Sequence, residues 1–193
     1  SFTLFVIVIF IQSCSGTKSN INADLKKKYD KGITLFNKKK YPRAIEQFKY
    51  IIMNNPGSRI SIDSQFYLAE SKFYNKDYIE SSSEYTLFIR WSTDLEKIEE
   101  AKYKIASCAV HSVNDFQKDQ TETLAALNLL QEFIDEYPNS NRIYECEKLV
   151  DELRDKLAKK DYETARLYLK LEKYDSAVIY FNQVINEFYD TIF

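Results

Sequence analysis

The chain has 193 residues, of which 45% are hydrophobic and 29% are charged, so it can bury a core and disorder is not expected. Its three glycines, Gly16, Gly32 and Gly57, lie far apart, which excludes a glycine-rich phosphate-binding loop. The formal net charge of −2 predicts no general attraction to nucleic acid or anionic lipid, and a single histidine, His111, excludes a histidine-rich metal site, so no cofactor is expected.

The chain opens with an apolar run. Residues 2–11 are apolar except for Thr3, which is too short for a bilayer span of roughly 20 residues but fits the apolar region of a secretory signal. Ile11, Ser13 and Cys14 resemble the bacterial lipobox, which implies cleavage before Cys14 and lipidation of that cysteine. We therefore predict that residues 1–13 are a signal peptide, truncated at its start, and that residues 14–22 are the lipidated cysteine and a tether. The alternatives are an ordinary signal peptide with a coincidental cysteine, or a buried first helix.

From Ala23 onward the pattern is helical. A first apolar stripe at helical spacing is followed by a restart at Tyr41-Pro42 and a stop at Asn55-Pro56. This stripe contains Leu25, Tyr29, Ile33 and Phe36. Residues 23–57 are therefore predicted to form a helical hairpin with the tetratricopeptide period, in which Phe48 fills the space beside Gly32 and Ala44.

The same spacing recurs three times. We predict further repeats at residues 58–93, 94–139 and 140–190, the last with an extended first helix, and residues 191–193 are expected to begin a missing C-terminal repeat. In the second repeat Ser81 stands where Ala44 stands in the first. Because each repeat can bury its apolar face only against its neighbours, the expected fold is all-α, a right-handed solenoid of tetratricopeptide-like helical hairpins.

Two longer sequence segments narrow the class of protein. Residues 119–140, DQTETLAALNLLQEFIDEYPNS, and residues 151–191 resemble the BamD family, the lipoprotein subunit of the machinery that assembles outer-membrane β-barrels. The chain departs from that family at Ser81, which replaces an alanine, at Tyr189, which replaces a proline, and in lacking a fifth repeat.

The resemblance implies a non-enzymatic scaffold that is lipid-anchored at the periplasmic face of the outer membrane. Its implied partners are the periplasmic POTRA domains of the barrel subunit, which family members contact through their C-terminal repeats, and unfolded outer-membrane proteins, which the N-terminal repeats receive. Whether accessory lipoproteins also bind is left open. The runner-up is a periplasmic repeat lipoprotein that organises cell-wall synthesis or division. A third interpretation is an enzyme with accessory repeats, against which stands the lack of a nucleophile–base pair.

Candidate binding residues come from the first helices of the first two repeats. Their outward positions are expected to line a concave, aromatic surface suited to an extended peptide with an aromatic end, although several of them could instead pack between repeats. These positions are Tyr29, Ile33, Phe36, Asn37, Phe66, Glu70, Phe73 and Tyr74. In the fourth repeat Arg166 and Lys170 lie one turn apart and could meet an acidic partner, or simply face solvent.

The remaining reactive side chains are expected to be structural. Cys108 and Cys146 lie on predicted helices and are interpreted as buried thiols, and the sequence leaves open whether they are paired in an oxidising periplasm. His111 is expected on the surface near a long loop. The acidic cluster at residues 96–100 alternates with lysine and is interpreted as an exposed helix face.

Overall fold

The computed structural model describes the backbone of residues 15–193 and the side chains from Ala23 onward. The predicted signal peptide and Cys14 lie outside the described residues, whereas the backbone of residues 15–22, predicted to be a tether, is helical and begins α1. Within the described range the chain forms eight α-helices and no strand. The helices are α1 (Ser15–Asn37), α2 (Tyr41–Asn54), α3 (Arg59–Tyr74), α4 (Tyr78–Trp91), α5 (Leu95–Ser112), α6 (Thr121–Glu136), α7 (Ile143–Lys170) and α8 (Tyr174–Glu187).

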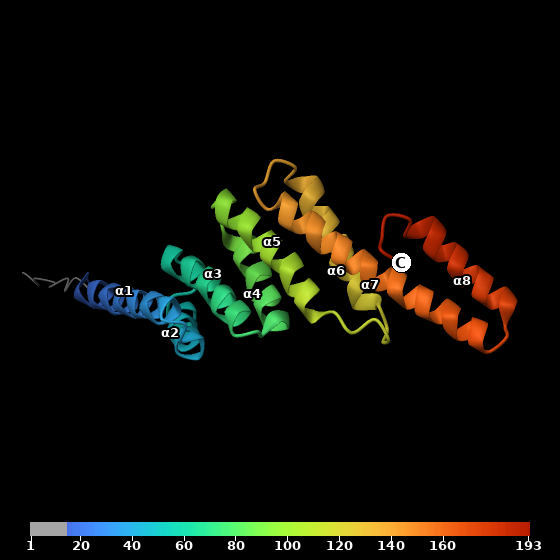
Figure 1. Ribbon diagram of the computed structural model, residues 1–193. Coiled ribbons are helices and arrows are strands. Elements are labelled where there is room, and N and C mark those ends of the chain that lie inside the picture. Colours follow the sequence, from blue (N-terminus) through green and yellow to red (C-terminus); the bar gives the residue numbers. More distant parts are fainter. Residues whose placement is uncertain (1–14) are drawn as a thin grey trace, which may run out of the picture.

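Consecutive helices pack against each other as hairpins, and the hairpins follow one another along an elongated molecule (Figure 1). The α1–α2 hairpin lies at one end and the α7–α8 hairpin at the other. This arrangement confirms the predicted all-helical repeat fold. It follows from the sequence because a 14- to 18-residue amphipathic helix can bury its apolar stripe only against its partner and the next hairpin.

Three of the four hairpins close with the same turn. Lys39, Lys76 and Glu172 have positive φ values of 57°, 69° and 57°. At the first turn the Lys39 amide donates to the Phe36 carbonyl (2.8 Å), and the following amide donates to the Leu35 carbonyl (2.9 Å). The same two bonds recur in the other two turns, so each first helix ends in a Schellman motif although no glycine is present there. The repeated turn gives these hairpins the same tight connection.

The first hairpin is closed around Phe48. Its ring is fully buried, and a Cβ built on Gly32 would stand 2.7 Å from the ring carbon Cε1. The absence of a side chain at Gly32 therefore makes room for Phe48, as predicted from the spacing. Ala44 belongs to the same buried cluster, so small residues on both helices accompany one large ring.

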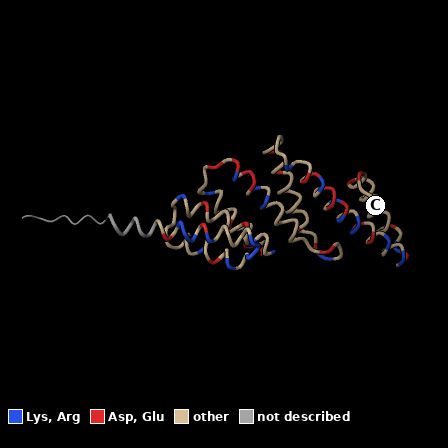
Figure 2. Tube along the Cα trace, turned by 60° about the vertical axis from the view of Figure 1, so that its left-hand side comes forward, with Lys and Arg blue, Asp and Glu red and all other residues tan. Residues whose placement is uncertain are grey.

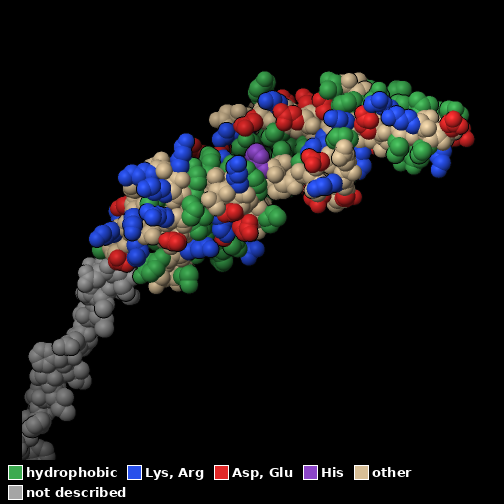
Figure 3. Space-filling view, turned by 60° about the horizontal axis from the view of Figure 1, so that its bottom comes forward, with side chains coloured by type: hydrophobic (Ala, Val, Ile, Leu, Met, Phe, Trp, Pro, Cys, Tyr) green, Lys and Arg blue, Asp and Glu red, His purple; other side chains and the backbone are tan. Residues whose placement is uncertain are grey.

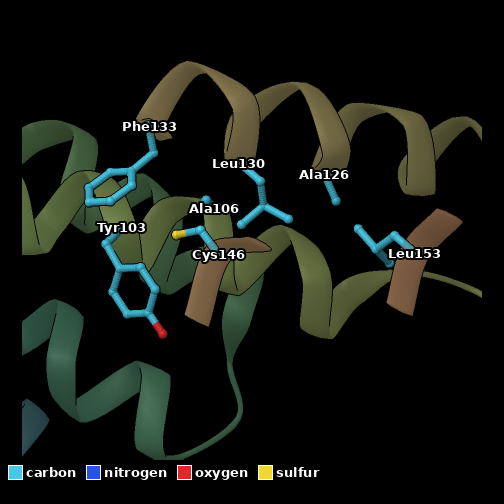
Figure 4. Close-up of a cluster of buried hydrophobic side chains, with 7 residues drawn as sticks. All are labelled: Tyr103, Ala106, Ala126, Leu130, Phe133, Cys146 and Leu153. Atoms are coloured by element: carbon cyan, nitrogen blue, oxygen red, sulfur yellow. The ribbon is translucent and has the colours of Figure 1, made fainter. Parts of the chain in front are cut away.

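Helix α7 joins two parts of the core. It is a single continuous helix of 28 residues. Its first half contributes Cys146 and Leu153 to a buried cluster with α5 and α6 that also contains Leu130 and Tyr103 (Figure 4). Its second half packs along α8, with Ala165 fully buried.

Candidate binding surfaces

The predicted peptide-binding positions do not form one continuous outward face. Tyr29 packs edge-on against Phe48 (ring centroids 6.0 Å) and Tyr67 (6.1 Å), and Ile33 belongs to the same cluster. Phe66 packs against Phe88 (5.1 Å). These side chains therefore hold neighbouring helices together, which was the alternative left open by the sequence.

The other predicted positions are nearer the surface. Phe36, Asn37, Phe73 and Tyr74 lie at the C-terminal ends of α1 and α3, beside the turns that close the first two hairpins. Asn37 is exposed, the side chain of Tyr74 is 47% exposed, and the two phenylalanines are half-buried. The structure thus brings together the part of the predicted set that lies at the turn end of the hairpins.

Additional rings extend this group into what we call the aromatic strip. The strip consists of Phe36, Tyr41, Phe73, Tyr74, Tyr78 and His111. Tyr41 stacks on Tyr74 (ring centroids 5.7 Å), and Tyr78 stacks on His111 (4.7 Å), while Phe73 contacts both Tyr74 (5.5 Å) and Tyr78 (5.6 Å). Tyr41 and Tyr78 were not predicted, because they begin α2 and α4, whereas the concave surface was expected on the first helices of the hairpins.

Glu70 was wrongly predicted to face outward. Its side chain is only 9% exposed, and its carboxylate accepts a hydrogen bond from the Tyr85 hydroxyl. Burial raises the pKa of the Glu70 carboxyl, and the charge of Lys104 and the Tyr85 hydrogen bond partly oppose that rise. The Lys104 ammonium lies 4.3 Å from the centre of the Phe73 ring, beneath the aromatic strip. A glutamate on a helix suggests exposure, and its two partners are too distant in sequence to signal otherwise.

A second apolar surface lies on the other end of the same hairpins. A pocket of about 430 Å³ is lined by the end of α2, the start of α3 and the end of α4. Its walls include Ile52, Ile62, Leu87 and Trp91, and the indole of Trp91 is 65% exposed. The available sequence signal was the single tryptophan of the chain, four residues after Leu87 on α4.

The acidic cluster of α5 is not a simple exposed face. Glu100 accepts three hydrogen bonds from the Arg142 guanidinium, one from Nε at 3.2 Å and two from Nη2 at 2.9 and 3.0 Å. Glu99 accepts a hydrogen bond from the Ser140 hydroxyl at 2.6 Å. Arg142 also lies over the Tyr103 ring at 4.7 Å. Charged side chains therefore fasten the third hairpin to the start of α7, and only Glu96 of the cluster is exposed.

At the C-terminal end the predicted pair faces solvent. Arg166 and Lys170 are both exposed, and Arg166 bonds the neighbouring Glu163 at 3.0 Å. The same hairpin also exposes large apolar side chains along α7, α8 and the segments that follow each helix. The exposed members are Leu167, Leu169, Leu171, Tyr174, Val178, Ile179, Ile185 and Tyr189. The sequence analysis named only the charged pair of this hairpin as a candidate binding site.

Both described cysteines are buried and unpaired. Burial raises the pKa of each thiol to about 11, so each remains protonated near neutral pH. His111, exposed as expected, stacks on Tyr78. Among the described residues no three His, Cys, Asp or Glu side chains are grouped as metal ligands, and none of the helices searched there is long and apolar enough to cross a bilayer.

Known proteins are similar to this chain over most of its length. The profile of YfiO, described as an outer membrane lipoprotein, matches residues 22–193. An "Outer membrane protein assembly factor BamD" of Rickettsia prowazekii (strain Madrid E) is 28% identical over 190 residues, which are 97% of this chain and 76% of that protein. A protein with the same description from Caulobacter vibrioides (strain ATCC 19089 / CIP 103742 / CB 15) is 25% identical over 157 residues, 81% of this chain and 52% of that protein. The alignment thus covers about half of the Caulobacter protein.

Proposed function

This chain belongs to the YfiO family of outer membrane lipoproteins, and on that premise we propose that it is a non-enzymatic scaffold of the outer-membrane protein assembly machinery. A lipid on Cys14 holds it at the periplasmic face of the outer membrane. The observation that carries the proposal is the family match over residues 22–193, together with two similar assembly factors. Membership also confirms the resemblance seen in residues 119–140 and 151–191.

The N-terminal hairpins bind unfolded outer-membrane proteins through the aromatic strip. The strip offers several stacked rings, with Tyr74 47% exposed, on the side of the hairpins where their first helices end. An extended peptide with an aromatic end gains both apolar burial and edge-to-face ring contacts on such a surface. The buried ammonium of Lys104, 5.1 Å from the centre of the Tyr74 ring, adds positive potential beneath the strip, which favours a ligand with a terminal carboxylate.

A peptide-binding experiment tests this surface. A fluorescent peptide with the C-terminal sequence of a barrel protein is titrated with the full chain, and Tyr74→Ser is compared with Tyr144→Ser, whose side chain is 80% exposed on α7. We expect Tyr74→Ser to weaken binding at least fivefold, because a stacking ring contributes about 1 kcal/mol, and Tyr144→Ser to leave it unchanged.

Emission from Trp91 reports on the competing pocket in the same titration, since it is the single tryptophan of the chain. An unchanged spectrum agrees with binding at the strip. A blue shift on peptide addition, with Tyr74→Ser harmless, would move the peptide site to the pocket between α2, α3 and α4.

The last hairpin binds the periplasmic POTRA domains of the barrel subunit. Support comes from the exposed apolar side chains of this hairpin and from exposed Arg166 and Lys170, a combination of apolar area and charge that suits a protein interface. Charge reversal of the pair, Arg166→Glu with Lys170→Glu, is expected to reduce recovery of the barrel subunit. The matched control reverses Arg59 and Arg90, which are exposed on α3 and α4.

Membership of the machinery is tested by affinity recovery of the full chain from detergent-solubilised envelopes, with Cys14→Ala in parallel. We expect a large barrel protein with POTRA domains among the recovered proteins. Cys14→Ala should lose membrane anchorage but keep some partner binding. Recovery of cell-wall enzymes without a barrel subunit would reject the proposal in favour of a cell-wall scaffold.

A further inference from the structure

Positive charge is concentrated at one end of this molecule. Residues 23–57 contain nine Lys or Arg against three Asp or Glu, a net charge of +6, whereas residues 58–193 contain seventeen against twenty-six, a net charge of −9. Figure 3 shows Lys and Arg side chains gathered over the α1–α2 end of the molecule. Along the long helix that leads to the last hairpin, acidic and basic residues instead alternate (Figure 2). The small net charge of the chain is thus the sum of a basic first hairpin and an acidic remainder.

The positive charges of the α1–α2 hairpin are available to a partner. Eight of its nine Lys and Arg side chains are exposed, the exception being Lys28, whose ammonium lies 4.1 Å from the centre of the Tyr50 ring. Among the described residues the hairpin forms one ion pair, between Lys26 and Asp30 at 3.6 Å. The eight exposed side chains are Lys26, Lys27, Lys31, Lys38, Lys39, Lys40, Arg43 and Lys49.

Part of this charge is arranged as a line. Lys27, Lys31 and Lys38 are four and seven residues apart, so they fall on one face of α1 and its continuation; we call them the lysine stripe. Helix α1 has 23 residues and is therefore about 35 Å long, and the stripe follows its second half to the turn. A row of charges along a helix axis fits an extended negative surface better than a single acidic group.

We propose that the α1–α2 hairpin docks lengthwise on an anionic bilayer surface through the lysine stripe. Helix α1 begins at Ser15, directly after the cysteine whose lipid enters the membrane, so the hairpin is confined near the headgroups. The inference rests on the proposed function only in taking that cysteine to be lipidated. Lysines held within a Debye length of about 8–10 Å from anionic lipid add a second, salt-sensitive attachment to the acyl anchor.

The acidic remainder of the molecule makes the docking directional. An anionic surface attracts the +6 hairpin and repels the −9 body, so the hairpin lies on the bilayer while α5 to α8 extend away from it. A lipid tether alone would leave the direction of the body free. The basic hairpin therefore sets which side of the scaffold faces the membrane.

Vesicle sedimentation tests the proposal with the full chain carrying Cys14→Ala, so that no lipid contributes. Vesicles of phosphatidylethanolamine and phosphatidylglycerol at 3:1 are compared with neutral phosphatidylcholine vesicles, and the difference between them removes any binding by the apolar residues 2–11. We expect preferential binding to the anionic vesicles in 50 mM NaCl and loss of that preference in 500 mM NaCl. Lys27→Gln, Lys31→Gln and Lys38→Gln together should weaken it roughly tenfold or more.

The matched control replaces Lys118, Lys148 and Lys173, three exposed lysines outside the α1–α2 hairpin, by Gln, and should change binding less than twofold. Equal binding to both vesicle types, salt-independent binding, or equal losses in the two triple variants would overturn the proposal. Retention on heparin without vesicle binding would do the same and assign the charge to a soluble polyanion. The vesicle experiment contains no assembly partner, so a negative result there would not contradict the proposed scaffold function. A negative envelope recovery would likewise not contradict binding to vesicles.

Discussion

The first and last hairpins are built around the same pair of rings. Tyr29 meets Phe48 with ring centroids 6.0 Å apart at 68°, and Tyr162 meets Phe181 at 5.9 Å and 68°. In both hairpins the two aromatic residues are nineteen positions apart. Yet the first hairpin presents eight exposed basic side chains, whereas the last presents exposed leucines, isoleucines and tyrosines.

Phe48 and Phe181, the rings contributed by the second helices of these two hairpins, also differ in their surroundings. Phe48 is fully buried because Tyr67 of the next hairpin stacks on it at 5.8 Å, while Phe181 remains half-buried. The comparison separates two contributions to the stability of a repeat. The internal spacing of the motif determines how the two helices meet, and the neighbouring hairpin determines how much of that contact is removed from water.

The largest expected effect tests this separation. Phe48→Ala should lower the free energy of unfolding by about 3–5 kcal/mol, as for a fully buried ring, and Phe181→Ala by about 1–2 kcal/mol, because its ring already contacts solvent. Urea denaturation of each variant followed by circular dichroism measures both values. Equal losses would mean that the neighbouring hairpin adds nothing, and a loss under about 1 kcal/mol at Phe48 would contradict the burial of its ring.

A smaller loss of folding stability is expected at the small residue in the first helix of each of these two hairpins. Gly32→Ala should cost about 1–3 kcal/mol, because its new Cβ would stand 2.7 Å from a ring that cannot move. The equivalent position in the last hairpin, Ala165, already carries a methyl group, and Ala165→Gly should cost about 0.5–1 kcal/mol through helix propensity.

The double variant Gly32→Ala with Phe48→Leu checks the cause. If the clash is with the ring, thermal or urea unfolding of the double variant should show less destabilisation than the sum of the two single changes. Strict additivity would locate the cost elsewhere in α1.

A smaller effect concerns Glu70, a carboxyl buried in the second hairpin near the charge of Lys104 on α5. The folded-state pKa of Glu70 is raised from its ordinary 4.5, so folding favours the protonated carboxyl, and its contribution to stability is lost as pH rises from 4.5 through that raised value. Glu70→Gln should therefore become more stable relative to the parent chain at pH 7.5 than at pH 4.5. Urea midpoints at the two pH values measure this, with Glu46→Gln, an exposed change, as control.

The sequence predicted the fold because repeat proteins are specified locally. Gly32, Ala44 and Phe48 lie close in the chain, and their small–small–large pattern needs no knowledge of distant segments. The turn residues Lys39 and Lys76 were less evident, since a left-handed turn usually carries glycine and here is enforced by the two helices it joins.

The placement of the candidate side chains was harder to predict because it depends on contacts between residues distant in the chain. Glu70 bonds Tyr85 and is influenced by the charge of Lys104, fifteen and thirty-four positions away, and no local pattern signals its burial. The Trp91 pocket likewise needs three helices to be placed. Net charge describes the distribution of charge poorly for a different reason, since a sum over 193 residues conceals a basic first hairpin and an acidic remainder.

The unbroken course of α7 has a mechanical consequence. At 28 residues it is about 42 Å long, and it belongs to two hairpin layers at once. A displacement of the last hairpin cannot be absorbed by a flexible turn, as it could where two helices meet at a short loop. The rigid helix α7 transmits the displacement to the Arg142–Glu100 contact and so to the third hairpin. A force applied to the last hairpin therefore acts on the third hairpin as well.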